Sequence, residues 1–206
     1  MFSNTLRVYL MSDIVISNQT QLTSGFLKVE ALTVEHPRFD GGSMTVRREL
    51  VRRKDCVSVL PFDPISEKIV LVEQFRIGAI DNPQGPFVFE LIAGLVDKGE
   101  TVFQAALREM REETGITDIV GEPTYLGKFF LSPGGCTEQT SLFLMPVLLD
   151  EEEVSRITSS AHGCANEGED IRVHVLNLED AVAFCQLNPS SMTTLAAIMA
   201  AKYGQK

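Results

Sequence analysis

The sequence lacks the features that mark several specialised classes of protein. No apolar run reaches the roughly 18 residues that a membrane-spanning helix needs. The amino terminus has no basic start followed by an apolar stretch and a small-residue cleavage site, so we expect no secretory signal peptide and a cytoplasmic protein without a membrane partner. Close cysteine pairs, typical of zinc ribbons and disulfide-rich scaffolds, are also absent, and we interpret all four cysteines as thiols: Cys56, Cys136, Cys164 and Cys185.

Positive charge is scarce as well. The 206 residues include 18 Lys and Arg against 28 Asp and Glu, which gives a formal net charge of -10. Because nucleic acids are bound through clustered Lys and Arg, this balance argues against a nucleic-acid partner. An anionic small molecule would need local cations or a bound metal ion.

The hydrophobic pattern divides the chain into a short and a long part. Residues 1–50 carry alternating apolar positions broken by turn-like His-Pro and Asp-Gly-Gly, which predicts short antiparallel strands too small to bury a core alone. We therefore expect a β segment over 1–50 and the main domain over 51–206. Residues 1–10 add little pattern, and a natural start at Met11 and an ordinary flexible tail are equally good interpretations.

The long part alternates strand and helix patterns. Strands are expected over 56–62, 68–75, 87–91, 124–131, 140–149 and 171–176. Helical periodicity covers 102–114, 179–185 and 192–203. Strands before, between and after helices predict an α/β protein in which helices sandwich a mixed sheet.

One helix in the segment 94–116, GLVDKGETVFQAALREMREETGI, is bounded by its own sequence. Thr101 and Gln104 form a capping-box pattern at its start, and Gly115 supplies a stop that tolerates a left-handed backbone. At about 100° per residue, Glu109 and Glu113 lie about 40° apart on one face, with Glu112 about 60° to the other side of Glu109.

Three carboxylates at one end of a short helix repel each other, and they lie near the carboxy end, where the helix dipole also disfavours anions. Arg108 and Arg111 offset part of this charge, so one interpretation is a solvated surface helix with ion pairs. The alternative is a bound hard cation. Mg²⁺ favours carboxylate oxygens and keeps several waters, which suits it to bridging a pyrophosphate.

The segment resembles the Nudix box, GX5EX7REUXEEXGU with U aliphatic, at every fixed position: Gly94, Glu100, Arg108, Glu109, Met110, Glu112, Glu113, Gly115 and Ile116. The resemblance implies an α/β/α Nudix sandwich and a metal site for Mg²⁺, with Mn²⁺ as the alternative. It implies that Glu109 and Glu113 are the principal ligands, with Glu112 and the backbone carbonyl of Ala93 as further ones. Arg108 would orient the glutamates, and Glu100 would have a structural role.

Outside the box, the chain resembles bacterial ADP-ribose pyrophosphatases over about residues 26–175. The resemblance is carried by six segments: VRRE from Val46, LPFDP from Leu60, EQFR from Glu73, ELIAG from Glu90, LSPGGCTE from Leu131 and NEGEDIRVHV from Asn166. It implies hydrolysis of the ADP-ribose pyrophosphate to AMP and ribose 5-phosphate.

The same resemblance implies contacts with the substrate. Phe26 and Arg48 would clasp the adenine, with Phe26 contributed by the partner subunit of a homodimer built on residues 1–50. Arg76 would contact the phosphates, and Glu138 would bond a ribose hydroxyl. An aromatic face, a guanidinium plane and a cation suit these tasks. Phe26 in a core and Arg48 in a surface ion pair are the ordinary alternatives.

A base must take a proton from the attacking water, and the acidic loop 163–170 offers two candidates. The resemblance implies Glu167 as the base and Glu169 as an additional metal ligand, with Glu112 also at the catalytic centre. The two loop carboxylates are close enough to exchange roles. His162 and His174 are other candidates, although His174 falls in a strand pattern where a packed histidine is the better interpretation.

Two rival functions stay open. Another nucleoside diphosphate sugar, such as GDP-mannose, would use the same box and much of the same flanking pattern. A nucleotide-sensing Nudix module without hydrolysis is a different class, which the complete box argues against.

Overall fold

The computed structural model describes residues 13–164, 166 and 168–204, so the question of Met11 and the tail before it, and the position of Glu167, lie outside the described residues. The chain forms two compact units. One comprises residues up to Lys54 together with Ser132–Glu138, and the other comprises Asp55–Leu131 with Gln139 onward.

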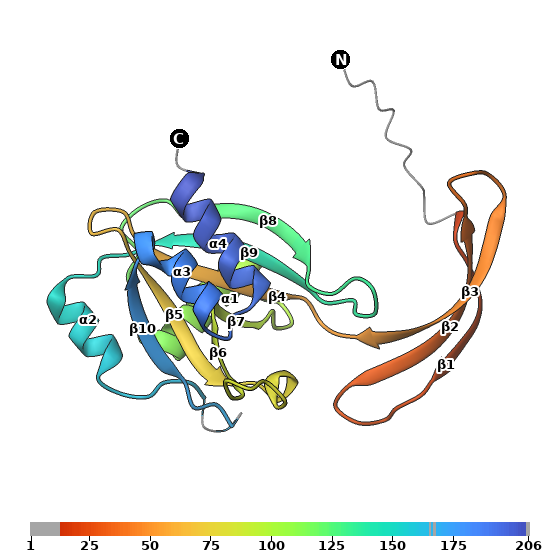
Figure 1. The fold of residues 1–206 in the computed structure, drawn as a ribbon, viewed down its shortest axis with the longest axis horizontal. Helices are drawn as coiled ribbons and strands as arrows, with labels where there is room; N and C mark the ends of the chain where they lie inside the picture. The colour runs from red at the N-terminus through yellow and green to blue at the C-terminus, as the bar shows by residue number, and fades with distance from the viewer. Residues whose placement is uncertain (1–12, 165, 167, 205–206) are drawn as a thin grey trace, which may run out of the picture. The chain divides into compact units, whose positions relative to one another are not determined.

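The first unit is a three-stranded antiparallel sheet in the order β1-β2-β3. Its strands, orange to red in Figure 1, are β1 (Val15–Gln21), β2 (Lys28–Pro37) and β3 (Ser43–Arg52). All of β1 is exposed, and the buried apolar side chains of the described part of this unit are Ala31 and Leu32. The expected antiparallel strands are therefore present, and they bury little apolar surface within one chain.

The second unit contains a seven-stranded mixed sheet in the order β10-β5-β4-β9-β8, with β6 beside β5 and β7 beside β4. Pairing is antiparallel except between β4 and β9, which run parallel. The strands are β4 (Cys56–Asp63), β5 (Lys68–Phe75), β6 (Phe87–Glu90), β7 (Ile92–Leu95), β8 (Thr124–Phe130), β9 (Gln139–Pro146) and β10 (Arg172–Asn177).

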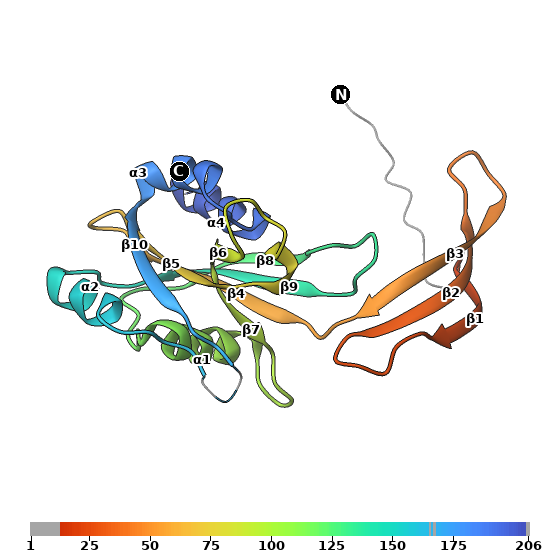
Figure 2. The same cartoon turned by 60° about the horizontal axis from the view of Figure 1, so that its bottom comes forward.

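Helices cover both faces of this sheet, as Figure 2 shows. They are α1 (Val102–Thr114), α2 (Glu151–Thr158), α3 (Leu178–Leu187) and α4 (Met192–Tyr203). Alternate residues of β4 enter opposite cores: Val57 and Val59 pack in the α1 and α2 layer, and Leu60 and Phe62 in the α3 and α4 layer. The expected α/β/α sandwich is confirmed. No helix in the described chain is long and apolar enough to cross a membrane.

Two expectations about residues 140–158 were wrong. The strand expected to reach residue 149 ends at Pro146, whose ring removes a backbone donor. Helix α2 was not expected at all, because its acidic sequence buries one side chain, Ile157. Its signal is local: the Asp150 side chain accepts the Glu153 N–H, and three glutamates fill the first turn, where the helix dipole favours anions.

The Asp63-Pro64 turn joins β4 to β5 as expected, and Asp63 organises it. This carboxylate is 2% exposed. It accepts hydrogen bonds from the backbone N–H groups of Ile65 (2.8 Å), Ser66 (3.2 Å) and Leu149 (3.0 Å), and from the Ser66 hydroxyl (2.8 Å). Burial alone would raise the pKa of Asp63, but these hydrogen bonds outweigh it and the pKa is lowered.

We predict that Asp63→Asn lowers the free energy of unfolding by roughly 1–3 kcal/mol at pH 7, because the amide replaces one accepting oxygen with a donor. Since the folded pKa is below the usual value, the carboxylate's contribution is complete above about pH 3.9 and is lost as the pH falls through the folded pKa. Denaturant unfolding at pH 7 and in acid measures the difference. The exposed Asp81→Asn is the control, and an equal loss in both variants would contradict the assignment.

Candidate active site

Helix α1 begins and ends where its sequence predicts. The Thr101 hydroxyl accepts the Gln104 N–H at 3.2 Å, and the Gln104 side chain accepts the Thr101 N–H at 2.9 Å. Gly115 closes the helix in a left-handed conformation, with φ 76°, and donates its N–H to the Arg111 carbonyl. Ala105, Ala106 and Met110 bury one face against the sheet. The caps and the buried face together fix the direction in which the glutamates point.

Glu113 is the buried member of the glutamate group, 1% exposed. The Ala93 N–H in β7 donates to its Oε2 at 3.3 Å. Burial, and then the negative charges of Glu109 and Glu169, raise the pKa of Glu113 well above its usual range, against the opposing effects of the Ala93 N–H and the Arg76 charge. Three carboxylates from α1 and the acidic loop therefore influence one another across a small region.

Arg108 is the cation that holds this group in place. Its Nη1 donates to Glu109 at 2.6 Å and to Glu112 at 3.0 Å. Its Nε and Nη2 each bond a different oxygen of Glu100 at 3.0 Å, and Nη2 also donates to the Leu95 carbonyl at 3.0 Å. This is the geometry expected of an arginine that orients glutamates, with Glu100 holding the arginine in turn.

Arg108 compensates part of the negative charge of Glu109, but the pKa of Glu109 is still raised. Burial raises its pKa; hydrogen bonding and charge from Arg108 oppose that rise, and the charges of Glu112 and Glu169 add to it. Gly94 makes room for this side chain, since a Cβ at Gly94 would lie 1.8 Å from Glu109 Oε1. The glycine that begins the box is thus required by the approach of a carboxylate to β7.

The acidic loop brings Glu169 to the α1 glutamates. The Cys164 N–H donates to Glu169 Oε2 at 3.0 Å, and the Gly163 N–H donates to the Glu112 carbonyl at 3.2 Å. The charge of Glu169 raises the pKa of both Glu109 and Glu113. Glu167, the expected base, lies outside the described residues.

The two histidines near this loop have other partners. His162 Nε2 lies 2.8 Å from the Ile157 carbonyl oxygen. His174 Nε2 lies 2.9 Å from Glu73 Oε2, and its ring packs edge-on against Phe89, with ring centroids 5.0 Å apart. His174 is therefore a packed and hydrogen-bonded strand residue, as the strand pattern predicts.

The argument for a metal ion at this position comes from the type of donor atoms present and not from a preformed coordination shell. Among the described residues, no three acidic, His or Cys side chains are already arranged around one point. Arg108 accounts for part of this, because its guanidinium is bonded to Glu109 and Glu112. The donor set is nevertheless made of hard carboxylate oxygens whose repulsion a divalent cation relieves. The residues present fit such an ion.

Arg76 joins the same region from the end of β5. Its Nε donates to Glu90 Oε2 at 2.5 Å. Its positive charge also lowers the pKa of Glu113, which opposes the larger effect of burial there. A guanidinium is thus held beside the carboxylates, as a contact to an anionic diphosphate requires.

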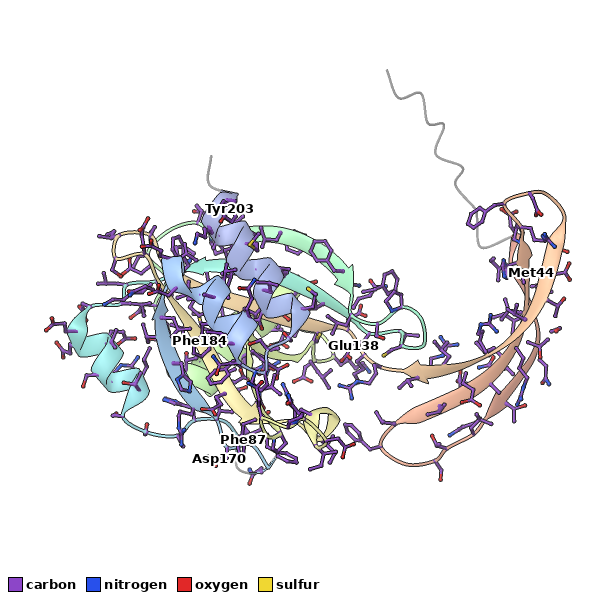
Figure 3. The ribbon with its side chains drawn as sticks, in the orientation of Figure 1. Met44, Phe87, Glu138, Asp170, Phe184 and Tyr203 are labelled. Atoms are coloured by element: carbon purple, nitrogen blue, oxygen red, sulfur yellow. The ribbon has the colours of Figure 1, made fainter. Side chains whose placement is uncertain are left out.

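The other expected substrate residues belong to the first unit. Phe26 is 90% exposed, which excludes the core alternative, and the Arg53 guanidinium carbon lies 5.8 Å from its ring centroid. Arg53 Nη2 also lies 3.1 Å from Glu138 Oε1, on the β8–β9 loop where Figure 3 labels Glu138. The structure therefore gathers Phe26 and Glu138 around Arg53, a residue that sequence reasoning missed because nothing local separates it from Arg52.

Arg48 is not part of that group within one chain. It lies opposite Leu32 in the β2–β3 ladder, and its Nη1 donates to the Arg47 carbonyl at 2.9 Å. Arg52, which pairs with Lys28 close to Phe26, is four residues further along β3, or about 13 Å of strand. The expectation that Phe26 of a partner subunit joins Arg48 at an adenine therefore stays a prediction.

The chain is similar to known proteins in sequence and in fold. A family model described as the NUDIX domain matches residues 52–195. The ADP-ribose pyrophosphatase of Escherichia coli (strain K12) is 38% identical over 172 residues, covering 82% of this chain and 78% of that protein. The GDP-mannose pyrophosphatase of Klebsiella pneumoniae is 31% identical over 142 residues, covering 68% and 67%. A crystal structure of an ADP compounds hydrolase, 19% identical with a TM-score of 0.65, covers 92% of each chain and shows the same fold.

We predict that Gly94→Ala leaves the fold intact and lowers turnover by about 100-fold, since misplacing a group at the reacting centre by about 1 Å has an effect of that size. The new methyl group meets the end of the Glu109 side chain, which can swing away, so stability changes little while the carboxylate is displaced. Steady-state rates and thermal melting separate the two effects. Gly121→Ala, whose Cβ meets Pro146 at an ordinary 3.5 Å, is the control; wild-type turnover in Gly94→Ala would contradict the role given to Glu109.

Proposed function

This chain belongs to the Nudix family of pyrophosphohydrolases, and from that premise we propose that it hydrolyses the pyrophosphate of ADP-ribose to AMP and ribose 5-phosphate. One observation carries the proposal. Burial and the negative charge of Glu169 raise the pKa values of Glu109 and of the buried Glu113, and the charge of Glu109 raises the pKa of Glu113 further. Repulsion of this kind costs stability, and such costs are characteristic of functional sites.

The proposed cofactor is Mg²⁺, with Mn²⁺ as a substitute, because both prefer the carboxylate and carbonyl oxygens found here. The residues proposed to hold it are Glu109 and Glu113, with the Ala93 carbonyl, Glu112 and Glu169 as further ligands. When bound, such an ion neutralises phosphate oxygens and fixes the diphosphate for in-line attack. Arg108 keeps Glu109 and Glu112 directed to one place, and Glu100 holds Arg108.

In the proposed reaction, a water oxygen bonds to one phosphorus while the bridging P–O bond breaks, and the water's proton passes to a carboxylate. We assign that carboxylate to Glu167 and keep Glu169 as its alternative. Both belong to the acidic loop 163–170. The negative charge of Glu169 raises the pKa values of Glu109 and Glu113, which supports a catalytic role for this loop. Arg76 supplies a fixed positive charge for the phosphates.

For the nucleoside half, we propose that Phe26 and Arg48 clasp the adenine and that Glu138 bonds a ribose hydroxyl. An aromatic ring as exposed as Phe26 is suited to stacking on a base. Because Arg48 lies on β3 and Phe26 lies before the start of β2, apart from Arg48 within one chain, this proposal includes a homodimer in which residues 1–50 pack on the partner. The exposed side chains of β1, including Val15 and Ile16, supply apolar surface for that packing.

ADP-ribose is favoured over GDP-mannose by the extent of the similarity. The relative named for ADP-ribose aligns with 82% of this chain at 38% identity, against 68% at 31% for the one named for GDP-mannose. GDP-mannose or another nucleoside diphosphate sugar is the second candidate. A sensing module without hydrolysis is the third, and the complete set of box glutamates speaks against it.

We predict that the purified protein releases AMP from ADP-ribose faster than it cleaves GDP-mannose, ADP-glucose, NADH or diadenosine polyphosphates, and only with a divalent cation. Product analysis with Mg²⁺, with Mn²⁺ and with a chelator measures both points. Preference for another compound would keep the chemistry and discard the substrate. Binding of ADP-ribose without any product from a folded, metal-loaded sample would favour the sensing module.

We predict that Glu113→Gln lowers turnover by roughly 100-fold or more, since removing a residue that merely supports a ligand already costs about 10- to 100-fold. The amide fills the same buried space, so the melting temperature should not fall by more than a few degrees. The exposed Glu122→Gln is the matched control. Near-normal turnover in a folded Glu113→Gln protein would rule out Glu113 as a principal ligand.

A further inference from the structure

The acidic loop 163–170 is closed at its base by one pair of residues. The His162 N–H donates to the Ile171 carbonyl at 2.8 Å, and the Ile171 N–H donates to the His162 carbonyl at 3.1 Å. The two residues form an isolated antiparallel bridge outside the named strands. Ile171 is fully buried in the core on the α1 and α2 side of the sheet. The core therefore anchors one end of the loop, and the position of the other end depends on His162.

Helix α2 fixes the side chain of His162. Its Nε2 lies 2.8 Å from the Ile157 carbonyl oxygen. Because a carbonyl oxygen only accepts, Nε2 carries the hydrogen and donates in this contact. The Ile157 carbonyl belongs to the last turn of α2, where a helix leaves its carbonyls without an internal partner, and the Ile157 side chain is fully buried. This engaged nitrogen cannot also take a proton from water, so the contact gives His162 a structural partner in α2.

The same ring packs against the end of α1. A Cβ at Gly115 would lie 3.4 Å from His162 Cε1 and 3.8 Å from Nδ1, so the ring covers the backbone of the residue that closes the helix. Arg156 of α2 reaches the same point, since its Nη2 donates to the Gly115 carbonyl at 3.0 Å. The next residue of the loop, Gly163, donates its N–H to the Glu112 carbonyl at 3.2 Å. The base of the acidic loop is therefore joined to the helix that carries the site glutamates.

Close packing couples the position of His162 to that of Glu169. Gly163 has φ 94°, and a Cβ there would lie 2.9 Å from Glu169 Cβ and 3.1 Å from Ile171 Cδ1. The Glu169 carboxylate accepts the Cys164 N–H at 3.0 Å, and the Glu169 N–H donates to the Cys164 carbonyl at 3.3 Å. The returning half of the loop thus lies directly on the residues that follow His162. A displacement of His162 would shift Glu169 relative to the α1 glutamates.

We propose that His162 is a positioning residue for the reaction. Its ring docks the base of the acidic loop on α2 and on the end of α1, and so sets where Glu167 and Glu169 lie relative to the α1 glutamates. The inference rests on the proposed function, since the two loop carboxylates take their roles from it. His162 acts through the loop and is not itself assigned a contact with the substrate or with the reacting phosphates.

His174 provides a matched comparison in the same part of the fold. It is half-buried like His162, its Nε2 lies 2.9 Å from Glu73 Oε2, and its ring packs edge-on against Phe89. It lies on β10, beyond the acidic loop. If the loss of any packed, hydrogen-bonded histidine here lowers turnover, substitutions of His162 and His174 should behave alike.

The first test is steady-state kinetics with ADP-ribose for wild type, His162→Leu, His174→Leu, Glu169→Gln and the His162→Leu/Glu169→Gln double variant. We expect His162→Leu to lower kcat by about 10- to 100-fold, because misplacing a reacting group by about 1 Å has an effect of up to that size, with KM within about twofold of wild type. His174→Leu should match wild type. Because His162 acts through the loop, His162→Leu should lower kcat less in the Glu169→Gln background than in wild type.

Hydrogen exchange of the metal-free protein gives a readout that does not depend on activity. The amides of Gly163, Cys164 and Glu169 are hydrogen-bonded in the structure. We expect His162→Leu to speed their exchange by about tenfold, the effect of losing about one hydrogen bond from the closed loop. The amides of β4 should keep their wild-type rates. His174→Leu should leave exchange in the loop unchanged.

His162→Gln keeps a donor for the Ile157 carbonyl, so it should recover part of kcat and of the loop's protection, and it serves in place of His162→Leu if the latter does not fold. Equal effects of the two leucine variants on kcat, full additivity with Glu169→Gln, or loop exchange at the wild-type rate would each overturn the inference. A wild-type protein that hydrolyses no nucleotide would overturn the proposed function alone, because hydrogen exchange still decides whether His162 docks the loop.

Discussion

The repulsion among Glu109, Glu112 and Glu113 is the constraint on which the candidate site depends. Three carboxylates within five residues, at the end of a helix whose dipole already disfavours anions, would by themselves weaken α1. The structure offsets this with one arginine that bonds Glu100, Glu109 and Glu112 together. Arg108 cannot reach every charge, however, and Glu113 remains buried with its pKa raised. The repulsion that Arg108 leaves uncompensated is the driving force for binding a cation here.

The rest of the second unit holds that group rigid. Helix α1 is capped at both ends and buries Ala105, Ala106 and Met110, so it cannot turn to relieve the repulsion. Strand β7 approaches closely enough that Gly94 has no room for a side chain. Beneath them, β4 is buried along its whole length and pairs with β9, β7 and β5. The unfavourable free energy of the glutamate repulsion is therefore offset by a hydrophobic core that extends far beyond the glutamates.

Local patterns could be predicted from the sequence, and long-range pairings could not. The bounds of α1 follow from Thr101, Gln104 and Gly115, all within one segment, and the two-sided burial of β4 and β5 is visible as continuous apolar runs. The parallel pairing of β4 with β9 leaves no local trace, and the Arg53–Glu138 pair joins residues 85 positions apart. Helix α2 was missed for another reason: it is short and polar, and its caps were its main signal.

The two kinds of residue in this protein also differ in what holds them. The glutamates of α1 are fixed by helix caps, burial and Arg108, interactions that persist whatever the substrate is. Phe26 and Glu138 are fixed by a loop, a strand end and one guanidinium, with the aromatic ring left in water. An exposed ring contributes little to folding, so its position is better explained by what it binds. The α1 carboxylates and the group around Arg53 are therefore held by separate sets of interactions.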